Sequence, residues 1–237
     1  MKLASTILLL VIATVFSAAQ VTMVGNGAGA TGGLKGVPFS ADVVTEISRV
    51  FGDGTQLHQE PQGKFYRDSE GRTRTEDEII APSGTFNRVI IHDVVARTII
   101  TFDLRSPVAT VHHTELHLRV PSAPSVEMAA RQAKPSHASF DRQNLGTMLI
   151  EGFTVTGTRM THTIEAGAIG NDKPLTDISE TWFSPQLKTV LLSVSESPAC
   201  GKRTRRLMNI QTTEPDPMLF QVPPDYTVRD DNPNNER

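Results

Sequence analysis

The densest group of candidate metal ligands in the sequence is His112-His113-Thr114-Glu115-Leu116-His117. Imidazole nitrogens and carboxylates are ligands that zinc accepts. The segment continues a β-branched run that begins at Val108, so we expect a strand with His113, Glu115 and His117 on one face. On a strand, His113 and His117 lie roughly 13 Å apart, which is too far to share one ion. A solvated strand face is therefore favoured here, and a zinc site that uses these residues is the less favoured alternative.

A second motif with chemical meaning is Gly27-Ala28-Gly29-Ala30-Thr31-Gly32, which matches the G-x-G-x-x-G pattern of dinucleotide sites. Such a site needs a strand before it and a helix after it, so that the pyrophosphate meets the helix N-terminus. An apolar N-terminal segment precedes it here, which favours a flexible linker. The sequence contains neither Gly-x-Ser-x-Gly nor Ser-x-x-Lys. We expect a protein that is not an enzyme and uses no cofactor.

Basic residues are concentrated in two short stretches. In 72–78, alternation places Arg72 and Arg74 on one face with two glutamates, as in a ladder of ion pairs across strands. The functional alternative puts both arginines at a cavity rim, where they contact an anionic headgroup or a partner. The second stretch, 202–206, is more typical of a solvated turn than of a binding patch. The formal net charge of −3 gives nucleic acid no reason to bind.

The N-terminus has the pattern of a secretory signal peptide. Lys2 provides the positive charge, Ile7 to Phe16 is apolar, and small residues follow at 17–19. This run is too short to span a bilayer, and no later stretch is long and apolar enough to do so. We therefore predict cleavage of residues 1–19, no transmembrane segment in the mature chain, and export to the periplasm or the extracellular space. Residues 20–36 are predicted to be a flexible glycine-rich segment.

The positions that must hold any site belong to short β-strands. Gly52-Asp53-Gly54 and Asp68-Ser69-Glu70-Gly71 each predict a hairpin turn, and β-branched runs separated by turns recur to the end of the chain. We predict one β-rich domain over 37–228, with about ten strands in a curved antiparallel sheet, an open half-barrel with one or two short helices. The Pro- and Ala-rich segment 121–139 is expected to contain one such helix, and the tail 229–237 to be disordered.

Three stretches together resemble the periplasmic lipoprotein-carrier superfamily, the LolA/LolB-like proteins. They are Lys64–Arg67 leading to Arg72–Glu76, Val89–Asp93 followed by Thr98–Asp103, and the closing segment Asp216–Tyr226 with its Phe and Pro-Pro. Segments between Leu145 and Asp172 are similar to those of uncharacterised exported bacterial proteins. The resemblance implies an unclosed, strongly curved antiparallel sheet around an apolar cavity, with helices over its open side.

These patterns favour an exported, non-catalytic envelope protein whose concave sheet binds a lipid, a lipoprotein or another apolar ligand. The candidate lining consists of Ile100, Phe102, Val190 and Leu192, although an ordinary core role for these four residues is favoured because every sheet buries one face. The alternative function is an envelope scaffold or protein-interaction module without a small ligand, which pairs through exposed strand edges. The sequence leaves the oligomeric state open.

Overall fold

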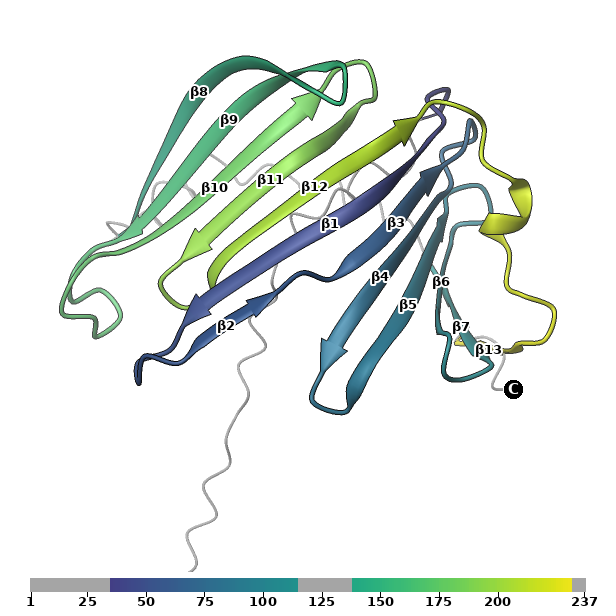
Figure 1. The fold of residues 1–237 in the computed structure, drawn as a ribbon, viewed down its shortest axis with the longest axis horizontal. Coiled ribbons are helices and arrows are strands. Elements are labelled where there is room, and N and C mark those ends of the chain that lie inside the picture. Colours follow the sequence, from purple (N-terminus) through teal and green to yellow (C-terminus); the bar gives the residue numbers. More distant parts are fainter. Residues whose placement is uncertain (1–34, 115–137, 232–237) are drawn as a thin grey trace, which may run out of the picture.

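The computed structural model describes residues 35–114 and 138–231, and within them thirteen strands form one sheet (Figure 1). A single turn of 3-10 helix, η2 (Pro217–Phe220), precedes the last strand. The strands are β1 (Phe39–Val50), β2 (Gln56–Gln59), β3 (Gln62–Arg67), β4 (Thr73–Ala81), β5 (Gly84–Asp93), β6 (Thr98–Asp103), β7 (Val108–His113), β8 (Ala138–Ile150), β9 (Phe153–Ile164), β10 (Leu175–Ser184), β11 (Thr189–Ser197), β12 (Gly201–Gln211) and β13 (Thr227–Asp230).

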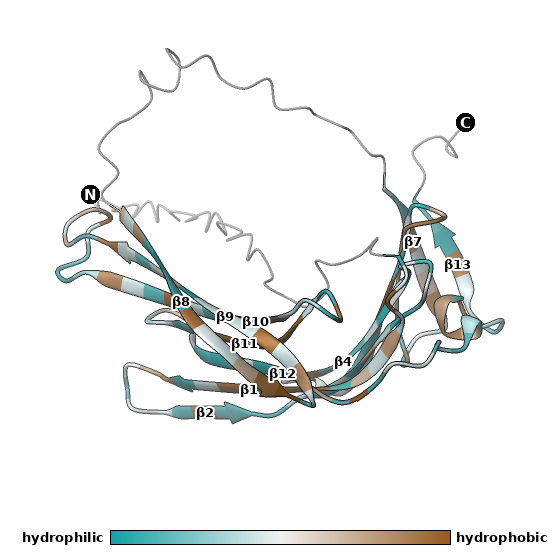
Figure 2. Cartoon of the chain, turned by 90° about the horizontal axis from the view of Figure 1, so that it is seen from above, coloured by the Kyte–Doolittle hydropathy of each residue, from teal (hydrophilic) through white to brown (hydrophobic). Residues whose placement is uncertain are grey.

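The strand order is β13-β7-β6-β5-β4-β3-β1-β12-β11-β10-β9-β8, and β2 pairs with β1. The sheet curves strongly and stays open, so β8 and β13 are its two edges in the described part of the chain (Figure 2). The predicted mainly β, open half-barrel is confirmed. Two details differ from the prediction, because the strands number thirteen and β13 pairs with β7 in parallel.

Both predicted hairpin turns are present. Gly54 and Gly71 have φ of +85° and +88°, a conformation that glycine adopts without a steric penalty. Asp53 and Asp68 accept backbone hydrogen bonds from residues two and four positions further on. Strands β2 and β3 are separated at Pro61, whose carbonyl accepts a bond of 3.0 Å from the Thr45 amide. As a result β1 pairs with β3 along one part of its length and with β2 along another.

Directly paired residues of antiparallel strands point to the same face, so the register defines two faces. One carries Ala41, Phe65, Thr75 and Ile90, which follow one another across β1, β3, β4 and β5. The residues of the opposite face pack against the C-terminal segment, which runs along the convex side of the sheet (Figure 2). The face that carries Ala41 and Phe65 is therefore the concave side, and we call it the inner face. The inner face of β1, β3 and β12 contributes much of one buried apolar cluster, made up of Phe39, Ala41, Val43, Phe65, Val155, Leu187, Leu191 and Leu207.

The opposite face, the outer face, carries the second apolar cluster. It contains Val89, Ile91, Phe102 and Ala109 from β5, β6 and β7, together with Phe220 of η2. The C-terminal segment 213–231 runs along the convex side of strands β3–β7, which we call the β3–β7 wing, and covers the cluster (Figures 1 and 2). Tyr226 lies edge-on to Phe102, with ring centroids 5.0 Å apart. The β3–β7 wing therefore has its main core on the outer face, and the other wing, formed by β1 and β8–β12, has its main core on the inner face.

Arg67 connects the two wings from the inner face. Its side chain is fully buried, and its Nε donates a bond of 2.9 Å to the carbonyl oxygen of Val37. Its Nη2 donates to the carbonyl oxygen of Leu187, in the turn between β10 and β11. The guanidinium also stacks on the ring of Phe39 at 4.7 Å. Burial lowers the pKa of Arg67, and the carbonyl partners offset part of the cost of burying the charge.

Several predictions about the chain concern residues outside the described parts. These are the signal peptide 1–19, most of the segment 20–36, and the helix expected within 121–139. The predicted disordered tail begins too early, because Arg229 and Asp230 belong to β13 and pair with Thr110 and Val111. Parallel pairing with a distant strand leaves no local turn signal, which explains why the sequence places the end of the sheet at residue 228.

Phe65→Ala is expected to lower the free energy of unfolding by about 3–5 kcal/mol, because it empties a fully buried position in the inner cluster. Phe140→Ala is the matched control, since this phenylalanine is 73% exposed on β8; its expected effect is below about 1 kcal/mol. Urea unfolding followed by circular dichroism measures both values. Equal losses in the two variants would contradict the placement of the core.

Candidate ligand-binding site

A groove of about 310 Å³ lies on the inner face, where the β1–β2 hairpin and the β4–β5 hairpin separate. It exists because Pro61 ends the pairing of β1 with β3, so the far part of β4 has β5 as its partner but not β3. Its apolar lining includes Val43 and Ile47 of β1 and Ile79 of β4. The other residues of the lining are Thr45, Gln59, Pro61, Gln62, Asp77, Glu78, Ile80, Arg88 and Arg203.

Three arginines lie on the inner face at this groove. Arg88 and Arg203 line it, and Arg205 is two residues further along β12, on the same side of the strand. Within the described part of the chain, the side chains of Arg203 and Arg205 make no hydrogen bond and no salt bridge. Burial lowers the pKa of Arg205, while the charge of Asp77 acts in the opposite direction and that of Arg203 adds to the lowering.

Beyond the arginines, the inner face becomes a floor of hydroxyl groups. The register places Arg205 opposite Ser193 of β11, and Ser193 opposite Thr181 of β10. One row further, Arg203 lies opposite Ser195, and Ser195 lies opposite Ser179. On the other side of β12, Arg203 lies opposite Ile47. The two arginines of β12 thus stand at the border between an apolar part and a polar part of the same concave surface.

A larger groove, of about 700 Å³, lies on the outer face beside the β1–β2 hairpin, near the same end of β1 and β12. Its lining includes Ser48, Lys202, Glu196 and Ile178, which the register places side by side on the outer face. Lys202 and Glu196 are directly opposite each other, so their charges compensate locally. The larger groove also contains Arg49, so charge alone does not separate the two grooves. We regard the inner groove as the better candidate site because it lies on the concave side of the sheet, between two hairpins.

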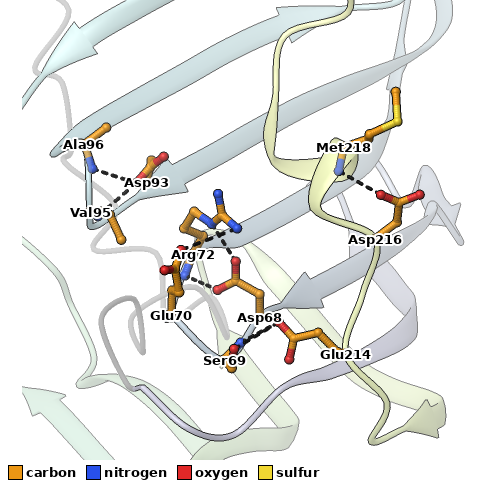
Figure 3. Close-up of polar contacts among 10 residues, drawn as sticks. All are labelled: Asp68, Ser69, Glu70, Arg72, Asp93, Val95, Ala96, Glu214, Asp216 and Met218. Atoms are coloured by element: carbon orange, nitrogen blue, oxygen red, sulfur yellow. Dashed lines mark hydrogen bonds and ion pairs between the residues drawn. The ribbon is translucent and has the colours of Figure 1, made fainter.

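The structure places Arg72 and Arg74 on the outer face, where they hold the C-terminal segment. Arg72 Nε donates to Asp68 Oδ2 at 2.5 Å (Figure 3). The guanidinium of Arg72 also stacks on the ring of Phe220. Arg74 bonds to Glu76 at 2.7 Å and to the Leu219 carbonyl oxygen at 2.9 Å. In the same region Glu214 accepts bonds from the amide and hydroxyl of Ser69. These arginines have protein partners and do not face the inner groove.

The predicted apolar lining also lies elsewhere. Ile100 and Phe102 pack in the outer cluster beneath the C-terminal segment, as the alternative of an ordinary core role anticipated. Leu192 lies opposite Arg206 on the outer face, and Val190 lies opposite Phe183 beyond a bulge in the β10–β11 register. The β11 register follows the expected alternation from Leu192 to Val194, and the bulge interrupts it between Val190 and Leu192. The choice of the concave side needed the curvature of the sheet, which alternation does not encode.

The histidines of β7 contact the C-terminal strand. His113 Nε2 lies 3.0 Å from Asp230 Oδ1, and His112 Nδ1 contacts Asp231 Oδ2. Glu115 and His117 lie outside the described residues. In the described ranges, no group of three His, Cys, Asp or Glu side chains is arranged to hold a metal ion.

Arg88, Arg203 and Arg205 were not singled out individually from the sequence. The available signal was the stretch 202–206, in which Arg203 and Arg205 alternate with outward residues and lead to the buried Leu207. That spacing places both arginines on the face of the core. Their convergence with Arg88 depends on the pairing of β1 with both β12 and β3, which a pattern within one strand does not reveal.

These features define an open, concave β-sheet with a groove that combines apolar and cationic lining. No family model matches the sequence, and no curated protein matches it. Among the described residues, no helix is long and apolar enough to cross a membrane.

Three solved structures with partial similarity share 8–10% sequence identity with the chain. An uncharacterized conserved protein from Thermus thermophilus has a TM-score of 0.44 and 10% identity, covering 82% of this chain and 90% of that one. A LolA superfamily protein from Nitrosomonas europaea has a TM-score of 0.34 and 8% identity, covering 81% and 94%. The MucA/MucB complex of Pseudomonas aeruginosa gives 0.34 and 10%, covering 81% of this chain and 58% of that one. The superfamily named by the sequence resemblance is thus among them, and the fold assignment rests on the sheet itself.

His92 provides a test of the inner face by pH. It lies opposite Thr73 and Ile99, and burial lowers its pKa below the ordinary value of 6.5. The unfolded chain therefore takes up this proton at a higher pH than the folded chain, so His92 makes the protein less stable as pH falls below 6.5. His92→Gln is expected to reduce the loss of unfolding free energy between about pH 8 and about pH 5. An unchanged loss, measured by urea unfolding at both pH values, would contradict the burial of this imidazole.

Proposed function

We propose that the protein is an exported binding protein that holds the apolar part of a lipid or lipidated molecule in the inner groove and does no chemistry on it. The observation that carries this proposal is the apolar lining of Val43, Ile47 and Ile79 on the concave side of an open sheet. The groove volume lies within the range of about 300–1,000 Å³ that is usual for small-molecule sites.

The contrast between the two faces supports the proposal. The outer cluster of the β3–β7 wing is filled by the chain's own Leu219, Phe220 and Tyr226. Among the described residues, no comparable segment lies in the inner groove, which retains its volume between two hairpins. Ile47 and Ile79 are partly exposed in this groove, and an apolar ligand stabilises such lining because binding removes its surface from water.

Export is the part of the proposal supported by the N-terminal sequence alone, with Lys2, the apolar run and the small residues at 17–19. One similar structure is described as a putative outer membrane lipoprotein-sorting protein domain from Vibrio parahaemolyticus, and this description refers to lipidated proteins. Its TM-score of 0.27 means that this likeness adds no argument about the ligand here.

A second candidate function is protein interaction through the sheet edge. β8 is thirteen residues long and is an edge strand of the described sheet, where it pairs with β9 alone. Its side chains Phe140 and Leu149 are 73% and 71% exposed. A long exposed edge with apolar side chains can accept another strand. Sedimentation velocity of the protein and of Leu149→Lys tests this function. Self-association that the substitution abolishes would favour it, and a monomer at all concentrations would argue against edge pairing between copies.

Binding of N-phenyl-1-naphthylamine, an uncharged dye that fluoresces in apolar surroundings, tests the primary proposal. We expect fluorescence enhancement with the wild-type protein and a loss of at least about tenfold in affinity for Ile47→Glu, because a carboxylate in the groove resists desolvation. Ile169→Glu is the control, since Ile169 is 68% exposed in a loop far from the groove in sequence.

Thermal unfolding of each variant checks that the fold persists. The proposal is contradicted if the wild-type protein produces no enhancement, or if both folded variants bind the dye as the wild type does.

A further inference from the structure

We propose that the inner face recognises the anionic headgroup of an amphiphile, with Arg203 and Arg205 as headgroup ligands and the adjoining hydroxyl floor as their polar surroundings. This inference rests on the proposed function and specifies the class of ligand. The tail lies over the groove lined by Val43, Ile47 and Ile79, and the head lies across β12 and β11.

The side chains of Arg203 and Arg205 differ from those of several other arginines in the sheet. Arg67, Arg74 and Arg159, which lie on strands of the described sheet, have protein partners. Arg159 contacts Glu180 at 2.6 Å, and Arg74 bonds to both Glu76 and Leu219. The side chains of Arg203 and Arg205 have no hydrogen bond or salt bridge to the described residues, although Asp77 is near enough to influence Arg205. A guanidinium presents five donors in a planar fork that matches phosphate and carboxylate geometry.

The side chains of the inner face change in polarity from β1 across β12 to β11. Arg203 has Ile47 on one side and Ser195 on the other, so three neighbouring strands pass from apolar through cationic to hydroxyl side chains. The next row repeats the cationic and hydroxyl steps with Arg205 and Ser193. An amphiphile has the same sequence of properties, from tail to charged head to its polar surroundings. A free inorganic anion would have no use for the apolar part.

The charged side chains around the inner groove carry a net positive charge. Arg88 faces the groove from β5, opposite Asp77 on β4, while Arg203 and Arg205 approach it from β12. Glu78, the other carboxylate of the lining, accepts a hydrogen bond of 3.1 Å from the Gln62 amide. Three guanidinium groups against two carboxylates leave an excess of positive charge in a chain whose net charge is negative. This local excess favours an anion within a concave surface.

Isothermal titration calorimetry with dodecyl phosphate and with monolauroylglycerol, an uncharged amphiphile with the same tail length, tests the inference. Both ligands are used below their critical micelle concentrations. We expect the wild-type protein to bind dodecyl phosphate at least about tenfold more tightly, with the difference shrinking at high salt. Arg203→Met and Arg205→Met are each expected to remove about tenfold in affinity for dodecyl phosphate and to leave monolauroylglycerol binding unchanged.

Arg206→Met is the matched control, because Arg206 is exposed on the outer face of the same strand and its substitution removes the same charge. Arg203 is also exposed, so its variant is informative even if Arg205→Met fails to fold. Equal weakening by Arg203→Met and Arg206→Met would overturn the headgroup site. Inorganic phosphate that binds as tightly as dodecyl phosphate would overturn it in favour of a simple anion site.

The outcomes separate this inference from the function on which it rests. Equal affinity for both amphiphiles, unaffected by the arginine variants, would overturn headgroup recognition and leave apolar binding in place. Binding of neither amphiphile would overturn both.

Discussion

Arg67 holds a guanidinium group at the buried junction of the two wings, and the remaining architecture depends on this arrangement. Its Nε and Nη2 donate to carbonyl groups of Val37 and Leu187, which are far apart in sequence, and its plane rests on Phe39. A buried acceptor that loses its donor costs about 1–3 kcal/mol, so the entry to β1, the end of β3 and the β10–β11 turn are stabilised together. These contacts, rather than a disulfide, join the three segments at the centre of the sheet, since the one cysteine, Cys200, is free.

An open sheet of thirteen strands has two faces, and in this chain the two faces are covered differently. On the β3–β7 wing the C-terminal segment covers the outer face, fastened by Arg72 and Arg74 through Phe220 and the Leu219 carbonyl. On the inner face, apolar residues at the centre adjoin a groove and a hydroxyl-rich surface. The outer face of the β3–β7 wing is therefore covered by the chain itself. Among the described residues, the inner face retains the space and the unpaired cations from which the binding function is inferred.

The sequence supports prediction of those features that local chemistry encodes. The Asp53-Gly54 turn, the turn at 68–71 and the alternation of apolar residues in β6 give hairpins and strands at the observed places. Pairings across long separations are different, because β13 joins β7 and β1 joins β12 without any local signal. The candidate site required the second kind of information. Alternation separates Leu191 from Leu192 and Arg205 from Arg206, yet only the pairing and the curvature identify which of them faces the concave side.

The central claim is that the concave face of this sheet holds an amphiphile. Native mass spectrometry of the protein purified from the envelope of an exporting host, combined with lipid extraction, tests it most directly. The account predicts an additional mass in the native spectrum that disappears on denaturation and is recovered as an anionic lipid in the extract. A native spectrum with the mass of the polypeptide alone, together with an extract free of lipid, would contradict the account.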